Sequence, residues 1–112
     1  MPFLTVHTNA KVENTDAFLQ EAAEFVASEL RKPISYVIVS LDAGAEMIFG
    51  GKPEVKSALV EMKSIGFGNK SDLAVKLTNF LEQKLKLDRS HINIHFINMP
   101  GADLSIGGNL LG

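Results

Sequence analysis

The sequence predicts an α/β protein made of two β-α-β units with pseudo-twofold symmetry. Their strands would form a four-stranded mixed sheet with two helices on one face, plus short edge strands. Three observations support this prediction: two amphipathic segments with the same apolar spacing, an asparagine before each, and an alternating apolar run after each. The two sets lie 55 positions apart, which indicates an internal repeat.

The amphipathic segments are residues 15–31 (TDAFLQEAAEFVASELR) and residues 70–86 (KSDLAVKLTNFLEQKLK). In each, apolar residues recur at relative positions 0, 4, 7, 8 and 12, which places them on one face of a helix. Asn14 and Asn69 stand where an asparagine side chain can accept a hydrogen bond from a free amide of the first turn. We therefore expect two helices that cover the same side of one sheet.

Strands are predicted on both sides of each helix. Residues 36–41 (YVIVSL) and 91–96 (HINIHF) alternate with period two and are rich in β-branched side chains. Residues 3–8 (FLTVHT) and 58–65 (ALVEMKSI) are the candidates for the strands before the helices. Each unit should then hold two parallel strands joined by a right-handed crossover.

The repeat does not keep its register in the first strands, because an offset of 55 places Val6 on Glu61. Residues 45–51 (AEMIFGG) and the glycine-rich tail (GADLSIGGNLLG) are expected to add short edge strands. The sheet face away from the helices should be mixed in character, which suits a sheet packed around a partly wet centre in an oligomer. Plain exposure to solvent is the alternative. The residues predicted on this face are Thr5, His7, Tyr36, Ile38, Ser40, His91, Asn93, His95 and Ile97.

Length and composition indicate one domain, residues 1–112, with its own core. The net charge is −2 and no lysine or arginine cluster forms a stripe, so we expect no nucleic-acid or membrane partner. The absence of cysteine excludes disulfides, thiolate metal sites and cysteine nucleophiles. No apolar run approaches the roughly 20 residues of a membrane span. No signal-peptide pattern is visible, so we expect a soluble, cytoplasmic protein that is released, if at all, by another route.

Three short stretches are expected to meet at one edge of the sheet. Pro2 begins the first strand, and Lys32 in RKPISY comes just before the second. Parallel strands start at the same edge. An antiparallel second unit would bring the end of the third strand there as well, with Ser64, Ile65 and Gly66. An amine, a cation and an apolar wall would then share one pocket.

A terminal proline exposed by loss of Met1 is a secondary amine. Burial and the nearby Lys32 cation would both lower its pKa from the usual 7.7–8.0 of an α-amino group. A partly neutral amine can act as a general base and take a proton from the carbon next to a carbonyl. Lys32 can pair with a substrate carboxylate or stabilise an enolate. The alternatives are that Pro2 is an ordinary neighbour of the start methionine and that Lys32 complements the end of the first helix.

The histidines are weaker candidates. On a strand, His91 and His95 would lie ~13 Å apart at ~3.3 Å per residue, too far to share an ion, so no metal site is predicted. His7 stands alone on its strand, and no Ser-His-Asp arrangement can be argued. GFGNKS lacks the spacing of a phosphate loop and is read as a turn into the second helix.

MPFLTVHTN, KPISY, MIFGG, SIG and INIHF, in this order over the whole chain, resemble the macrophage migration inhibitory factor family. D-dopachrome tautomerase is its sister branch, within the tautomerase superfamily with an amino-terminal proline. The resemblance implies a homotrimer around a central channel, active sites between subunits, and keto–enol tautomerisation of phenylpyruvate-like α-keto acids without a cofactor. The resemblance does not identify a receptor.

By position, the resemblance implies Pro2 as the catalytic base, Lys32 as the residue that binds the substrate carboxylate, and Ser64 and Ile65 as pocket lining. Asn93 and His95 would contribute to the site from a neighbouring subunit. Tyr36, Leu104 and Ile106 would lie at the mouth of the pocket.

The chain departs from the family pattern at several positions. Animal members commonly have tyrosine at Asn93, asparagine at His95 and tryptophan at Ile106, so an aromatic ligand loses stacking partners here. Ser57 and Val60 stand where the cytokine has a CxxC motif, so we expect no thiol-disulfide activity. The prediction is an isomerase, a tautomerase of α-keto acids. The alternative is a non-enzymatic, cytokine-like trimer that binds other proteins and retains an unused pocket.

Overall fold

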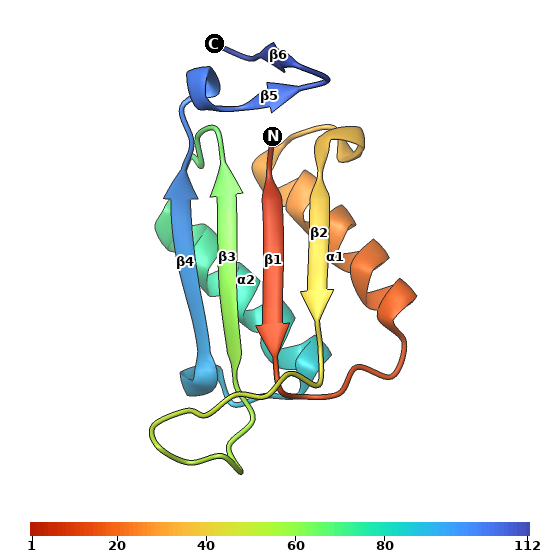
Figure 1. The fold of residues 1–112 in the computed structure, drawn as a ribbon, viewed down its shortest axis with the longest axis vertical. Coiled ribbons are helices and arrows are strands. Elements are labelled where there is room, and N and C mark those ends of the chain that lie inside the picture. The colour runs from red at the N-terminus through yellow and green to blue at the C-terminus, as the bar shows by residue number, and fades with distance from the viewer.

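The computed structural model describes all residues, 1–112, and its centre is a four-stranded sheet (Figure 1). The strands are β1 (Phe3–Thr8), β2 (Ile38–Asp42), β3 (Ala58–Ser64) and β4 (Ile92–Asn98), in the order β2-β1-β3-β4. β1 is parallel to β2, β3 is parallel to β4, and β1 is antiparallel to β3. The two predicted β-α-β units, and their opposite directions, are confirmed.

The two helices, α1 (Thr15–Leu30) and α2 (Lys70–Leu85), lie on the same face of the sheet, behind it in Figure 1. The side chain of Asn14 accepts a hydrogen bond from the Ala17 amide at 3.0 Å. The side chain of Asn69 likewise accepts a hydrogen bond from the Asp72 amide at 3.0 Å. Both predicted caps are therefore present, and they fix where each helix begins.

The core lies between the helices and the sheet. Alternate residues of β1 and β3 point into it, as the period of a strand requires, and the helices contribute one face each. Among its fully buried side chains are Leu4, Val6, Val60, Met62, Ala22, Val26, Leu77 and Leu81. Phe25 of α1 stacks on Phe80 of α2 with ring centroids 4.8 Å apart, so the helices also contact each other.

The strand register explains why the repeat fails in the first strands. Leu4 pairs with Val39 in the first unit, and Val60 pairs with Ile94 in the second. Val39 and Ile94 are 55 positions apart, whereas Leu4 and Val60 are 56 apart. The connection between strand and helix is therefore one residue shorter in the second unit. A one-residue change reverses the face of every side chain, which is why Val6 falls on Glu61 at an offset of 55.

Two predicted strands begin later than expected. Residues 34–36 form a 3₁₀ turn, η1 (Ile34–Tyr36), in which the Tyr36 amide donates to the Pro33 carbonyl at 3.0 Å. His91 likewise ends a 3₁₀ turn, η2 (Arg89–His91), instead of starting β4. These local hydrogen bonds compete with the sheet for the same amides, and alternation alone does not reveal them.

The expected edge strand at residues 45–51 is wrong, because only an isolated bridge between Phe49 and Lys52 is present there. Gly50 and Gly51 have φ of 59° and 76°, which turns the chain back and ends any extended run. The tail does form strands, β5 (Ser105–Ile106) and β6 (Asn109–Leu110), after a 3₁₀ turn, η3 (Gly101–Asp103). They make a separate hairpin beyond the end of the main sheet (Figure 1).

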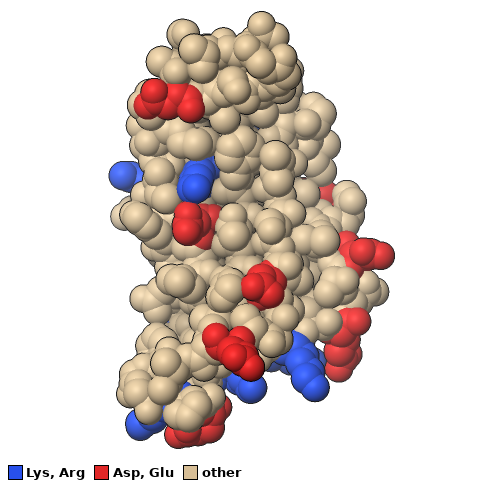
Figure 2. All heavy atoms as spheres, in the orientation of Figure 1, with Lys and Arg blue, Asp and Glu red and all other residues tan.

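The sheet face opposite the helices is open and mixed, as predicted. Ile38 and Leu59 are 59% and 56% exposed on it. Their polar neighbours on this face include Thr5, Ser40, Glu61, Asn93 and His95. Figure 2 shows this face as largely uncharged, with isolated acidic and basic side chains and no basic stripe. Neither helix has the length and apolar run that crossing a membrane requires.

Candidate functional site

The start of β1 and the end of α1 meet at one edge of the sheet. Pro2 is fully buried directly before β1, and its carbonyl accepts a hydrogen bond from the Ile38 amide of β2 at 3.2 Å. Lys32 follows α1, and its amide donates to the Ala27 carbonyl at 3.0 Å, which closes the last turn of the helix. The right-handed crossover therefore brings the two predicted residues to the same edge.

The amine at the start of the chain has an altered pKa at this edge. Partial burial lowers the pKa of the Met1 amino group, and the positive charge of Lys32 lowers it further. Both effects disfavour the protonated amine. With Met1 attached, the Pro2 nitrogen is part of a peptide bond and has no basic lone pair. With Met1 removed, the free amine would be that of Pro2, one residue further into the same edge.

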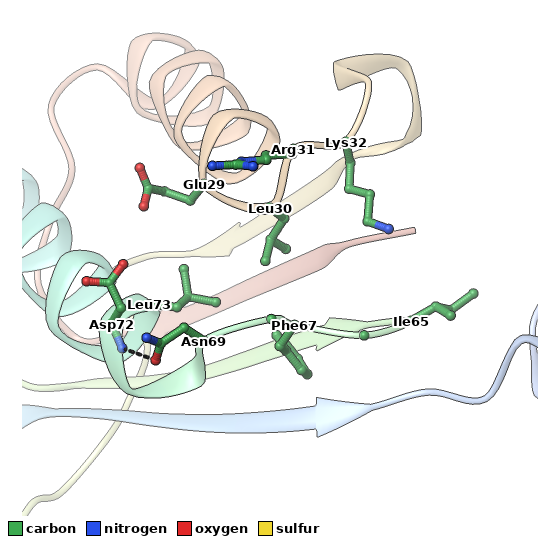
Figure 3. Close-up of a pocket in the computed structure, with 11 residues that line it drawn as sticks. Glu29, Leu30, Arg31, Lys32, Ile65, Phe67, Asn69, Asp72 and Leu73 are labelled. Atoms are coloured by element: carbon green, nitrogen blue, oxygen red, sulfur yellow. Dashed lines mark hydrogen bonds between the residues drawn. The ribbon is translucent and has the colours of Figure 1, made fainter.

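A groove of about 470 Å³ opens beside Lys32 (Figure 3). It runs between the end of α1 and the turn that leads into α2. The residues that line it are Glu29, Leu30, Arg31, Lys32, Ile65, Gly66, Phe67, Gly68, Asn69, Asp72 and Leu73. Lys32 and Ile65 both extend toward the start of β1 in Figure 3, whereas Glu29 and Asp72 lie at the other end.

Ser64, the last residue of β3, is fully buried. Its hydroxyl donates a hydrogen bond to the Gly66 carbonyl at 2.7 Å. Gly66 has a φ of 80°, and its amide donates to the Asn98 side chain at 2.9 Å. These bonds hold the turn that presents Ile65 to the groove, so Ser64 shapes the site through this turn.

Three further predicted residues lie outside the groove. Tyr36 ends η1 and is 51% exposed. Ile106 belongs to the terminal hairpin and is 43% exposed, and Leu104 accepts a hydrogen bond from the Leu111 amide at 3.0 Å. In Figure 1 this hairpin lies beyond the edge where β1 begins. The three residues thus belong to the same end of the molecule but do not line the groove within one chain.

Asn93 and His95 lie on β4, exposed on the open face. They pair with Leu59 and Glu61 of β3, which separates them from β1. Two strand spacings, roughly 10 Å, lie between β4 and β1. Within one subunit, therefore, these side chains cannot reach the amine at Pro2.

The groove also contains residues that sequence analysis missed, above all Arg31, Phe67 and Leu73. Arg31 has a left-handed backbone, with φ of 53°, at the C-terminal end of α1. Its counterpart, Lys86, has φ of 56° at the end of α2. The only sequence signal was the repeat, which aligns these two cations. No group of three His, Asp or Glu side chains is arranged to hold a metal ion.

The chain is thus an α/β protein of two β-α-β units that share one mixed sheet. An amine and a lysine lie at the edge of the sheet where the chain begins. The chain matches the family model described as macrophage migration inhibitory factor over residues 1–112. It therefore belongs to the macrophage migration inhibitory factor family, as the sequence motifs indicated.

Related proteins match this chain over nearly their full lengths. The chain is 34% identical to a macrophage migration inhibitory factor homolog of Brugia malayi, with 100% of both chains covered. It is 32% identical to a homolog of Trichinella spiralis, covering 96% of this chain and 97% of that one. Among solved structures, a homologue from Prochlorococcus marinus superposes with a TM-score of 0.90 at 28% identity, covering 98% of this chain and 99% of that chain. The structure from Trichinella spiralis gives a TM-score of 0.87 at 32% identity, covering 96% and 98%.

Proposed function

We propose that this protein is a cofactor-free keto–enol tautomerase of small α-keto acids of the phenylpyruvate type, with Pro2 as general base once Met1 is removed. The observation that carries the proposal is the position of Pro2, which is buried at the edge of the sheet where burial and the Lys32 charge lower the pKa of the chain's first amine. Membership of the family supports it, because the tautomerase superfamily supplies an isomerase reaction for such an amine.

The chemistry follows from these groups. The neutral amine of Pro2 takes a proton from the carbon next to the substrate carbonyl and returns it to the oxygen, or the reverse. Lys32 holds the carboxylate by a charge-assisted hydrogen bond and stabilises the negative charge that develops on the enolate. Ile65 supplies an apolar wall that keeps water from competing for the proton. The proton moves within the substrate, so the reaction needs no cofactor.

We also propose that the working form is a homotrimer with sites between subunits. Asn93 and His95 face away from the helices and lie two strands from the base, so they can join a site only from a neighbouring chain. The exposed Ile38 and Leu59 side chains on the same face favour its burial in an assembly. Tyr36, Leu104 and Ile106 would then form the mouth of the shared pocket. The compartment we propose is the cytoplasm.

A non-enzymatic, protein-binding trimer is the second candidate. It is favoured if Met1 remains in the mature protein, because the Pro2 nitrogen is then an amide and cannot accept a proton. Mass spectrometry of the purified protein decides whether the base exists in the sample.

The test of the enzyme is turnover of phenylpyruvate by protein that lacks Met1, followed by ultraviolet absorption of the enol. Pro2→Gly should reduce kcat by at least about tenfold, since positioned general bases contribute roughly 10²–10⁴-fold to the rate. Pro53→Gly, in an exposed loop, is the matched control and should leave kcat unchanged. Equal turnover by the Pro2→Gly variant and the parent would contradict the mechanism, and absence of turnover on every keto–enol substrate would favour the protein-binding trimer.

A further inference from the structure

The groove beside Lys32 has that cation at one end, Arg31 together with the carboxylates of Glu29 and Asp72 at the other, and apolar side chains between them. In Figure 3 the Lys32 side chain extends toward the start of β1, and the Arg31 side chain extends the opposite way, toward Glu29. Leu30, Phe67 and Leu73 line the space between these ends. A ligand that matches this pattern has two anionic groups joined by a short apolar chain.

Neither cation has an acidic partner within the chain. The ion pairs at this end of the molecule join Lys76 to Glu29 at 3.3 Å and to Asp72 at 3.0 Å. Both carboxylates therefore share Lys76, whose pKa is raised by its hydrogen bonds to Asp72 and Glu29. Arg31 and Lys32 take part in no ion pair, so their donors remain available to an added anion. A guanidinium presents a planar fork of donors that fits a carboxylate.

The backbone at Arg31 has a left-handed conformation that Lys86 shares at the end of α2. Its φ of 53° lies in the left-handed region, which glycine occupies at the least cost at the end of a helix. An arginine there accepts backbone strain and places a long cation beside the groove. A cation at a helix C-terminus also complements the helix dipole, so the position needs a control that separates the two roles.

The internal repeat supplies that control. Lys86 ends α2 with φ of 56°, and it lines a second groove of about 300 Å³ between the end of α2 and the start of α1. The residue after Lys86 is the buried Leu87, whereas the residue after Arg31 is Lys32. Lys84 of the second groove is already paired with Glu21. The same helix-end cation therefore exists twice, once beside the candidate base and once without it.

We propose that Arg31 is a second anion-binding residue of the candidate site, and that the site prefers α-keto acids with a second carboxylate at the far end of a short apolar chain. This inference rests on the proposed function, because it takes Lys32 as the residue that holds the first carboxylate. The substrate class is thereby narrowed to 2-oxo dicarboxylates, with monocarboxylates such as phenylpyruvate as poorer substrates.

The experiment measures exchange of the carbon-3 protons for deuterium by NMR, in protein that lacks Met1. The substrates are phenylpyruvate and the 2-oxo dicarboxylates with one, two and three methylene groups. Arg31→Gly should lower kcat/KM for the best dicarboxylate roughly tenfold or more, mainly through KM, as loss of a charged hydrogen bond predicts. The same variant should lower kcat/KM for phenylpyruvate much less than it lowers that for the best dicarboxylate, because phenylpyruvate has no second carboxylate to lose.

Two further variants separate binding from strain. Lys86→Gly removes the same backbone strain and helix-end charge at the counterpart position, and should leave the ratio of dicarboxylate to phenylpyruvate unchanged. Arg31→Lys keeps the charge without the planar fork, and should retain part of the preference. If Arg31→Gly lowers both substrate classes equally, or neither, the inference is overturned while a Pro2-dependent exchange still supports the proposed function.

If no substrate exchanges, the proposed function fails, and calorimetric binding of 2-oxoglutarate then tests Arg31 alone. Binding that weakens roughly tenfold in Arg31→Gly but not in Lys86→Gly supports a dicarboxylate site without the reaction. Absence of binding, or equal binding by all variants, overturns the inference.

Discussion

The amino group at Met1 has a pKa that is lowered by burial and, to a smaller extent, by the positive charge of Lys32. The two residues come from different elements, since Met1 precedes β1 and Lys32 follows α1. Because β1 and β2 are parallel, the crossover through α1 must return the chain to the edge where it began. The proximity of the Met1 amine to the Lys32 cation at this edge is therefore a consequence of the topology.

The first prediction concerns the pH dependence of the proposed reaction. Only the neutral amine is a base, so kcat/KM should rise with pH and level off above the pKa of the free enzyme's amine. Burial and Lys32 both disfavour the charged form, so the midpoint should lie below that of an unperturbed α-amine. Lys32→Gln removes one of these effects and should move the midpoint to higher pH. Lys52→Gln, in an exposed loop, is the control; an unchanged midpoint in Lys32→Gln would mean that the lysine charge does not act on the base.

The second prediction concerns assembly through the open face of the sheet. Sedimentation should show a trimer, and Leu59→Glu should dissociate it by placing a charge in a buried interface. Val75→Glu is a matched control, because Val75 is 55% exposed on α2 and Leu59 is 56% exposed on β3. If the sites are shared between subunits, turnover should fall in Leu59→Glu to the extent that the trimer dissociates. Sedimentation of the parent protein as a monomer at working concentration would contradict the proposal of a site shared between subunits.

The third prediction concerns the helix caps. Asn14→Ala and Asn69→Ala should each lower the free energy of unfolding by about 1 kcal/mol, because an amide of the first turn loses its acceptor. Asn14→Asp and Asn69→Asp retain a side-chain oxygen at the same place and should cost little. Urea unfolding measures all four variants. Equal losses for alanine and aspartate would indicate that something other than the capping bond is lost.

The fourth prediction concerns the core between α2 and the sheet. Leu77 is completely buried, so Leu77→Ala should lower the free energy of unfolding by about 2–5 kcal/mol through lost burial and the cavity left behind. Val75→Ala, on the exposed side of the same helix, should change it by less than about 0.5 kcal/mol. Thermal or urea unfolding of both variants checks the difference. Similar losses at the two positions would contradict the orientation of α2.

The helices could be predicted well because their signals are local. The apolar spacing lies within each helix and the asparagine cap directly before it, and Asn14 and Asn69 have the expected bonds. The register of β1 and β3 could not be obtained from the repeat. A loop that is one residue shorter shifts the offset from 55 to 56, and only the pairing of Leu4 with Val39 and of Val60 with Ile94 reveals this.

The candidate site was predictable only in part. Lys32 and Ile65 line one groove, which is the proximity that the topology of the sheet predicted, while their roles remain predictions. Arg31, Phe67 and Leu73 share no pattern in the sequence, because each belongs to a different segment and meets the others only through packing. The 3₁₀ turns at Tyr36 and His91 were missed because alternation of apolar residues does not show which carbonyl an amide will bind.

The sequence alone determined the two units, their helices, the family, and the two residues at the start of parallel strands. These features depend on periodicity, on caps and on crossover handedness, which act along the chain. Tertiary structure alone decided the groove, the pairing of Glu29 with Lys76, and the unpaired state of Arg31. Those features depend on distances between segments far apart in sequence, and such distances are set by how the helices pack on the sheet.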